Sequence, residues 1–519
     1  MPTSRYSIGV SLPLQPAMPS VVSVSNRRRW AALAVLGLAV LLLAIDGTVL
    51  SLAVPALTAA LSPTAEQVLW IGDIYSLALA GTLVLMGNLA DRFGRKRVLL
   101  TGSVAFGAAS VLAACATTAD QLIAARLLLG LAGATLMPST LSLIRNLFPE
   151  ASERTRAIAI WSMAFGAGSA IGPLVGGFLL EHFWWGSVFL INVPVMLVVL
   201  VAGLILLPES KDPEPGRFDI TSAALSMLAV VPIIYAITHI TGTGVTPLIA
   251  TCSLVGICGG ILFVRRQRSL ASPMIDVKLF RNPAFSGAVA TNVVAIFALS
   301  GLMFFFSQYL QFARGFSPLQ AGLAELPSTI ASVAVVTLIG ALLGRLGRGN
   351  AIAMGMGMST IGLGLIAFAE GAENYLWLAL CLALIGFGVG LASTLTGDAI
   401  ISAAPSHKAG AVSAITETAQ ELGVVLGIAV LGSFLSATYR STIAGAIPAE
   451  LDPHIAARVL DSLGSALSVL EPDSLLVEAT RNAFVSAMQA TTLIAATLTL
   501  TATIIAWRLI PSTRGTGAR

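Results

Sequence analysis

The segment Gly87-Asn88-Leu89-Ala90-Asp91-Arg92-Phe93-Gly94-Arg95-Lys96-Arg97 is short and strongly basic, and it lies between two apolar stretches. A weaker copy follows at Gly340-Ala341-Leu342-Leu343-Gly344-Arg345-Leu346-Gly347-Arg348, with glycine and arginine at matching offsets. A basic loop alone would indicate only which side of a membrane it lies on. The glycine spacing, the acidic Asp91 inside the basic run and the second copy favour a membrane protein built by duplication.

Composition excludes an ordinary soluble protein. The chain has 519 residues, of which 56% are hydrophobic and 10% charged, against about 25% charged in soluble domains. Its net charge of +4 does not indicate nucleic-acid binding, because the basic residues lie in short loops between apolar segments. The four cysteines lie within apolar segments, without the spacing of metal ligands or of a disulfide framework. We therefore predict no metal and no other cofactor.

Fourteen stretches are long and apolar enough to cross a bilayer, which takes about 20 residues. Helices are expected for all of them, because a helix satisfies its own backbone hydrogen bonds in lipid. The stretches lie near 31–54, 68–90, 98–118, 121–143, 157–180, 187–207, 220–240, 244–264, 285–309, 318–342, 351–369, 375–397, 410–436 and 484–507.

Alternate loops carry nearly all of the arginine and lysine, and both termini are basic as well. By the positive-inside rule both termini are cytoplasmic, so the number of spans is even. The intervening short loops contain Glu66, Asp120, Glu181, Glu370 and Glu373.

The repeat divides the chain into two bundles of six helices. We predict a disordered cytoplasmic tail at 1–29, an N-terminal bundle at 30–207 and a linker with an inserted two-helix hairpin at 208–283. A C-terminal bundle at 284–507 carries a long, partly helical outer loop at 437–483, and a cytoplasmic tail follows at 508–519. The first apolar segment is too long for a signal peptide, so it should remain in the protein. Met18 is an alternative start.

Several charged residues lie inside predicted spans, where an ionised side chain costs roughly 2.5–3.5 kcal/mol even on a lenient scale. Counting from the helix ends places Asp46, Asp73 and Arg126 within roughly 12 Å of the outer surface, in helices that can face one another. They form either a structural ion pair or a carboxylate that titrates against a neighbouring arginine. A proton can switch such a pair, so the two interpretations overlap.

Three further acids lie inside predicted spans of the second half, and Asp398 lies near a cytoplasmic helix end. Glu325 lies one position from the repeat equivalent of Asp73. Glu417 and Glu421 are four residues apart and share one helical face. Either that face is buried and at least one of the two is protonated, or it is a solvated helix end.

The fifth span contains Gly166-Ala167-Gly168-Ser169-Ala170-Ile171-Gly172-Pro173-Leu174-Val175-Gly176-Gly177. The proline bends the helix and the glycines allow a neighbour to approach closely. Small residues alone would indicate only packing, but the order Gly-Pro followed by Gly-Gly is more specific.

Four motifs together resemble the fourteen-span drug:proton antiporters of the major facilitator superfamily. They are the basic hairpin, the Gly-Pro seam, Arg126 with Gly130 and Gly133, and Ile45-Asp46-Gly47-Thr48-Val49-Leu50-Ser51-Leu52-Ala53-Val54-Pro55. Within that family the chain is similar to exporters of quaternary ammonium compounds, methyl viologen and fluoroquinolones. Ser51 replaces the usual asparagine, and Gly186-Ser187 replaces a frequent Arg-Trp pair.

This resemblance implies an all-α membrane protein with the major facilitator fold, namely two pseudo-symmetric bundles plus the inserted hairpin. Proton coupling is then expected at Asp46, Arg126, Glu417 and Glu421. Substrate contacts are expected at Asp73, Trp70, Tyr75, Glu325 and Trp161, because aromatic faces attract lipophilic cations; lipid-facing aromatics are the alternative. Control of the conformational exchange is expected at Gly87, Asp91, Arg92, Gly94, Arg95, Gly172 and Pro173.

The leading hypothesis is a secondary active transporter, not an enzyme, of the bacterial inner membrane. It would exchange lipophilic cations for protons by alternating access, with no obligate protein partner. A transporter of the same fold for a physiological solute is the alternative, and a membrane sensor or scaffold is a third. The sequence lacks a Gly-x-x-x-x-Gly-Lys-Ser/Thr loop, which disfavours an ATP-driven pump.

Overall fold

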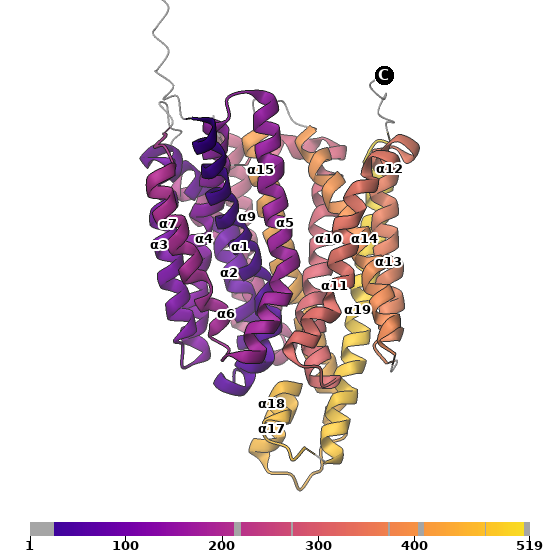
Figure 1. The fold of residues 1–519 in the computed structure, drawn as a ribbon. Coiled ribbons are helices and arrows are strands. Elements are labelled where there is room, and N and C mark those ends of the chain that lie inside the picture. Colours follow the sequence, from indigo (N-terminus) through magenta and orange to yellow (C-terminus); the bar gives the residue numbers. More distant parts are fainter. Residues whose placement is uncertain are drawn as a thin grey trace, which may run out of the picture.

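The computed structural model describes residues 25–211, 219–270, 273, 275–371, 374–402, 409–472 and 474–512. All regular structure in this part of the chain is helical, and fourteen helices are long and apolar enough to cross a membrane. The fourteen predicted spans and the all-α architecture are therefore confirmed. Two helical bundles stand side by side, the first in indigo and purple and the second in red to yellow (Figure 1).

The first bundle contains six spans, the last of which is split into α6 and α7 near residue 191. Their bounds are α1 (Asn26–Leu61), α2 (Ala65–Phe93), α3 (Arg95–Ala114), α4 (Ala119–Leu147), α5 (Ala151–His182), α6 (Ser187–Leu190) and α7 (Asn192–Leu206). The inserted hairpin follows as α8 (Ile220–Thr243) and α9 (Pro247–Ser269), and a short 3₁₀ turn at Val277–Arg281 leads to the second bundle.

The second bundle repeats this plan with more interruptions. A 3₁₀ turn at Val335–Leu338 and a π turn at Gly427–Leu431 interrupt two of its spans, and a π turn at Tyr309–Ala313 ends a third. Its helices are α10 (Pro283–Gln308), α11 (Pro318–Ala334), α12 (Ile339–Leu346), α13 (Arg348–Ala369), α14 (Tyr375–Ser402), α15 (Ala409–Leu426), α16 (Gly432–Ala444), α17 (Pro453–Asp461), α18 (Leu463–Leu467) and α19 (Leu475–Leu509).

The start of α1 and the end of α19 lie at one end of the molecule, which we call the terminal end (Figure 1). The short helices α17 and α18 lie at the opposite end, called the loop end. Helix therefore forms within the predicted outer loop, although α16 and α19 extend into its two margins.

The first turn of α1 extends into the predicted tail. Residues 26–29 are helical rather than disordered, because their arginines find partners on neighbouring elements. Arg28 donates to the carbonyl of Ile205 at 2.7 Å, and Arg29 pairs with Glu153 at 2.9 Å. Residues 1–24 and 513–519 lie outside the described residues.

The two bundles meet closely at the loop end, where α5 packs against α11. The carboxylate of Glu181 accepts from the backbone N–H of Leu319 at 3.4 Å, and the Gln311 amide donates to the carbonyl of Leu52 at 3.1 Å. Both contacts join the first bundle to the second.

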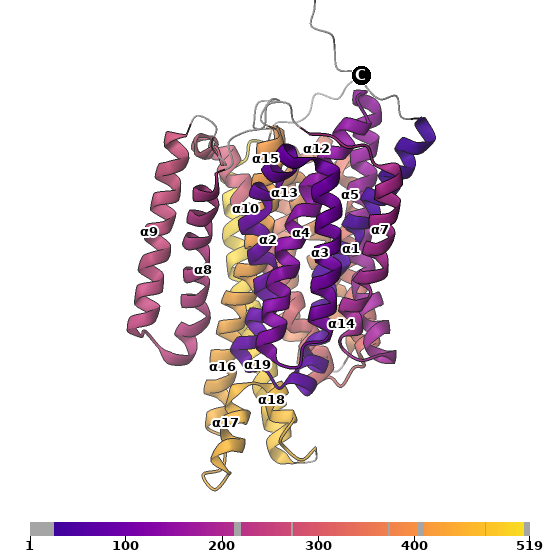
Figure 2. The same ribbon diagram turned by 90° about the vertical axis from the view of Figure 1, so that its left-hand side faces the viewer.

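The inserted hairpin stands at the side of the body (Figure 2). Its helix α8 packs on α2 and α16, whereas α9 packs mainly on α8. At the loop end, the imidazole of His239 lies 2.8 Å from the carboxylate of Glu66 on α2. Helix α8 thus attaches the whole hairpin to the two bundles.

The basic hairpin between α2 and α3 turns at Gly94, whose φ of 113° is one that side-chain-bearing residues rarely adopt. Its repeat equivalent Gly347 has a φ of 77° between α12 and α13. Asp91 and Arg95 form an ion pair of 2.8 Å across the turn. Glu209 accepts from the backbone N–H of Lys96 at 3.1 Å, so a carboxylate caps the positive end of α3.

We predict that Gly94→Ala lowers the thermal unfolding midpoint of the purified protein. The positive φ costs a non-glycine residue about 1–3 kcal/mol, and an added methyl group would lie 2.7 Å from the Glu209 carboxylate. Gly344→Ala is the matched control, because a methyl group there meets no atom within 4 Å. Equal midpoints for the two variants would contradict this account of the turn.

Candidate proton and substrate site

The centre of the first bundle contains a buried ion pair between Asp46 of α1 and Arg126 of α4. Their side chains are 1% and 2% exposed, and the closest nitrogen and oxygen are 3.4 Å apart. Charge-assisted hydrogen bonds are usually about 2.7–2.9 Å long, so this pair is held loosely. The predicted juxtaposition of the two residues is confirmed, and their role in proton coupling stays a prediction.

Asn192, at the start of α7, holds the other oxygen of Asp46. Its amide donates to Asp46 at 2.7 Å and lies 3.2 Å from the hydroxyl of Ser110 on α3. Asp46 is thus fixed more tightly by a neutral amide than by its charged partner.

Arg126 is surrounded by groups from α2. Its Nε donates to the carbonyl of Ile71 at 3.2 Å, and its guanidinium lies 4.6 Å from the centre of the Tyr75 ring. Tyr75, predicted to contact substrate, therefore has one ring face covered by an arginine.

Glu421 brings the second half into the same cluster. It lies on α15, and its carboxylate is hydrogen-bonded to Ser76 of α2 and interacts electrostatically with Arg126. Asp46 and Glu421 also both act on Tyr75. The sequence analysis selected these acids separately, and the structure places them around one arginine.

Glu417 lies one turn before Glu421 on α15. It interacts with Glu421 and with Arg145 near the end of α4. The predicted closeness of the two glutamates is confirmed, and each also has an arginine of the first bundle within electrostatic range.

Asp73 lies on α2 and is fully buried. Neither carboxylate oxygen has a hydrogen-bond partner among the described residues. Its neighbour Gly72 packs against the ring of Phe304 on α10 and against Ile428, so this part of α2 faces the second half. The residue next to Asp73 in the chain therefore contacts an aromatic ring of the other bundle.

The other three residues predicted to contact substrate lie away from the cluster around Arg126. Glu325 on α11 is 4% exposed, and its Oε1 has no partner among the described residues. Trp70 packs in an apolar cluster with Ile234 of the inserted hairpin. Trp161 donates its indole N–H to the hydroxyl of Thr140 at 3.1 Å, which gives this tryptophan a role in joining α5 to α4.

The Gly-Pro seam of α5 contacts both bundles. Gly172 faces Thr48 of α1, where a side chain would collide, and the carbonyl of Pro173 lies against Gly322 of α11. Helix α5 therefore packs both on the pair-bearing helix α1 and on α11 of the second half.

Sequence reasoning missed Asn192, Ser76 and Glu209, which are polar residues at helix starts, in helices or in a linker and carry no unusual signal. It also placed Glu370 among short outer loops. The structure keeps Glu370 at the end of α13 but buries it, with Thr492 of α19 donating to its carboxylate at 3.2 Å.

Within the described residues, no group of three or more His, Cys, Asp or Glu side chains is arranged to hold a metal ion. The polar groups gathered here are instead acids, arginines, hydroxyls and an amide on facing helices. In membrane proteins, ionisable side chains inside the spans often mark the pathway of a proton or an ion.

Comparison with known proteins agrees with this architecture. The family model of the Major Facilitator Superfamily matches residues 36–428. The multidrug efflux pump LfrA of Mycolicibacterium smegmatis is 44% identical over 92% of this chain and 95% of its own length. The methyl viologen resistance protein SmvA of Salmonella typhimurium is 37% identical over 88% of this chain and 93% of its own length.

A solved structure supports the fold alone. A bacterial homologue of the human lysosomal transporter Spinster, crystallised in an inward-facing and unoccupied conformation, has a TM-score of 0.64 and 19% sequence identity. The alignment covers 93% of this chain and 98% of that one. By its family-model match, its relatives and its fourteen spans, the chain belongs to the major facilitator superfamily.

Proposed function

We propose that this chain is a multidrug efflux antiporter that exports lipophilic, mainly cationic compounds in exchange for protons. Relatives named for multidrug efflux and for methyl viologen resistance support export of drugs of this kind. The proton gradient supplies the energy, so no cofactor takes part. Quaternary ammonium compounds, dyes and methyl viologen are the expected substrates, together with fluoroquinolones.

The observation that carries this proposal is the cluster around Arg126. One buried arginine is shared by Asp46 of the first bundle and Glu421 of the second. Removing the charge of either acid changes what the arginine can pair with. Binding of a proton in one half thereby changes the electrostatic environment of the acid in the other half. Coupled alternating access requires such an interaction between the halves.

In the ionised state Asp46 pairs with Arg126 across 3.4 Å. Protonation of Asp46 removes that attraction, while Asn192 still holds the carboxyl group in place. Arg126 is then free to interact more strongly with Glu421, and with Glu417 one turn further along. Release of the proton on the other side restores the first pair.

Asp73 and Glu325 are the proposed recognition groups for a cation. An isolated buried carboxylate is costly, and a cationic substrate would provide the missing partner. Phe304 packs against the adjacent residue Gly72 and would offer an aromatic face to a cation bound there. Trp70, Tyr75 and Trp161 are already packed against other residues, so in this proposal they support the site instead of binding the cation directly.

The basic hairpin between α2 and α3 and the Gly-Pro seam of α5 control the exchange between conformations in this proposal. The closure of α5 on α11 at the loop end is the arrangement expected of an inward-facing state, with the terminal end cytoplasmic. The Gly172–Pro173 seam would open at the loop end, while Gly87, Asp91, Arg92, Gly94 and Arg95 rearrange at the terminal end. The protein would lie in the bacterial inner membrane with both termini in the cytoplasm.

The function is tested by ethidium efflux from energised cells, with and without a protonophore. We expect energy-dependent efflux that the protonophore stops. Dye retention regardless of energy would refute drug export and would favour the same-fold exporter of a physiological solute.

We predict that Asp46→Asn reduces proton-driven efflux to the level of cells without the protein, while the variant still inserts. The asparagine keeps the shape and the bond from Asn192 but cannot exchange a proton or pair with Arg126. Efflux driven by an imposed pH gradient in membrane vesicles measures the effect. Asp398→Asn is the control, because Asp398 pairs with Arg348 at a more exposed helix end. Unchanged efflux by the Asp46 variant would exclude the coupling role.

We also predict that Asp73→Asn weakens export of dications by about tenfold more than export of matched monocations. Both classes lose the attraction of their nearest charge, and a second charge about 10 Å from the carboxylate adds roughly 1.7 kcal/mol in a medium of intermediate polarity, which is somewhat more than tenfold. Resistance to methyl viologen and to monovalent dyes measures the difference. Glu66→Gln removes a negative charge from the exposed start of the same helix and should spare both classes. Equal losses for both classes in the Asp73 variant would make Asp73 a structural residue.

A further inference from the structure

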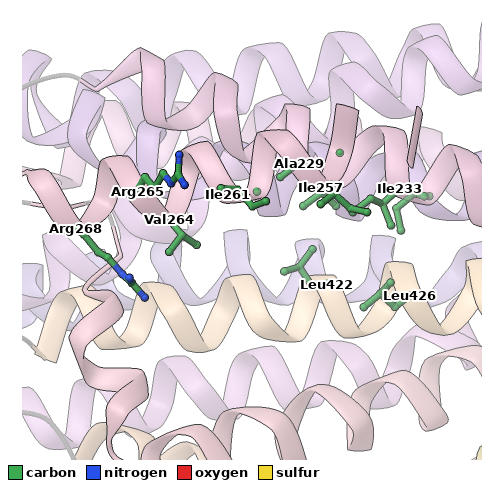
Figure 3. Close-up of a pocket in the computed structure, with 13 residues that line it drawn as sticks. Ala229, Ile233, Ile257, Ile261, Val264, Arg265, Arg268, Leu422 and Leu426 are labelled. Carbon is green, nitrogen blue, oxygen red and sulfur yellow. The ribbon is translucent and has the colours of Figure 1, made fainter. Parts of the chain in front are cut away.

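A groove separates the inserted hairpin from α15 on the side of the terminal end. It encloses about 640 Å³ and is lined by apolar side chains of α8, α9 and α15, including Ile233, Ile257, Ile261 and Leu426. Figure 3 shows these side chains along the space between α9 and α15. Because α9 packs mainly on α8, the hairpin itself leaves this space open.

Two arginines lie at one end of this apolar groove. Arg265 and Arg268, near the end of α9, both line it. Arg268 extends from α9 toward α15 (Figure 3). Neither side chain has a hydrogen-bonding or ion-pair partner among the described residues, and both residues are exposed.

Arg266 and Gln267, which lie between the two arginines in the chain, already have polar partners. Arg266 pairs with Asp219 at 2.8 Å, and Gln267 donates to the hydroxyl of Ser222 at 2.7 Å. Burial opposes ionisation of Asp219, but its bonds from Arg266 and Ser222 outweigh burial and keep the pKa of its carboxyl below its usual value. This ion pair therefore persists at neutral pH, and the two groove arginines have no acidic partner in the part of the chain that the structure describes.

We propose that this groove binds an anionic phospholipid, with an acyl chain along the apolar walls and the phosphate headgroup on Arg265 and Arg268. The arginines lie at the membrane end that is predicted to be cytoplasmic. Basic pockets between helices on that side are suited to anionic headgroups. The groove is apolar along its length and cationic at one end, so it is complementary to one phospholipid with an apolar chain and an anionic headgroup.

A drug cation is the competing occupant, since the volume also suits a drug-sized molecule. Two unpaired guanidinium groups would repel a cation, and the acids of the proposed transport site do not line the groove. The charge distribution thus favours a lipid anion over a transported cation, and the site is separate from the transport site.

The test measures lipid binding to the purified full-length protein by native mass spectrometry, with phosphatidylglycerol and phosphatidylcholine as probes. We expect preferential binding of phosphatidylglycerol. The double variant Arg265→Gln/Arg268→Gln should weaken that preference by about 30-fold, the effect expected for two arginines at a membrane surface. Lys278→Gln/Arg281→Gln is the control, because it removes the same charge from the neighbouring turn, outside the groove.

A second pair of variants tests the apolar part without altering charge. Ile261→Trp places a large ring in the groove and should displace the lipid. Leu262→Trp makes the same change at a neighbouring position of α9 that does not line the groove and should not. These two residues are similarly exposed, at 48% and 50%, so a general effect of tryptophan would appear in both.

Equal binding of the two lipids would overturn the proposal, as would equal loss of binding in the arginine variant and its control. Displacement of bound ethidium, rather than phosphatidylglycerol, by Ile261→Trp would also overturn it and would identify the groove as a substrate portal. Because lipid binding is measured without transport, failure of the proposed drug export would leave this test unaffected.

Discussion

The constraint on which the structure depends is that a charge in the interior of a membrane protein needs a partner on another helix. Asp46 and Arg126 are 80 residues apart in the chain, yet they meet where both are almost completely buried. Removing one partner of such a pair costs about 3–5 kcal/mol, because the other is left uncompensated. The relative positions of α1 and α4 are therefore tied to the ionisation of one carboxyl group.

The acids of this protein differ in how completely they are satisfied, and this difference suggests a division of labour. Asp46 has an amide and an arginine, and Glu421 has a hydroxyl and the same arginine. Asp73 has no hydrogen-bond partner among the described residues, and Glu325 has an unsatisfied oxygen. In the proposed mechanism, a proton on one of the satisfied acids changes which of them Arg126 pairs with. The others need a proton or a cation from outside.

Hydropathy, the repeated basic hairpin and the charged residues inside apolar segments were sufficient to predict fourteen helices and most of the acidic groups. They could not predict Asn192 or Ser76, because neutral polar residues are common in membrane helices and break no pattern. Hydropathy also leaves the rotation of each helix undetermined. Gly72 and Tyr75 lie three residues apart on α2, yet Tyr75 packs on Arg126 of the first bundle, whereas Gly72 faces the second bundle.

The inserted hairpin is attached to the two bundles mainly through one helix, α8. Only 22% of the most apolar window of α8 and 17% of that of α9 are buried, so most of this surface is left to lipid. Hydrophobic attraction between helices is absent in a bilayer, and α8 provides the hairpin's direct attachment to α2 and α16. A lipid held between α9 and α15 would add a second attachment, and α15 is the helix that carries Glu417 and Glu421. The composition of the surrounding membrane would then act on the helix that contributes the second half's acids to the shared arginine.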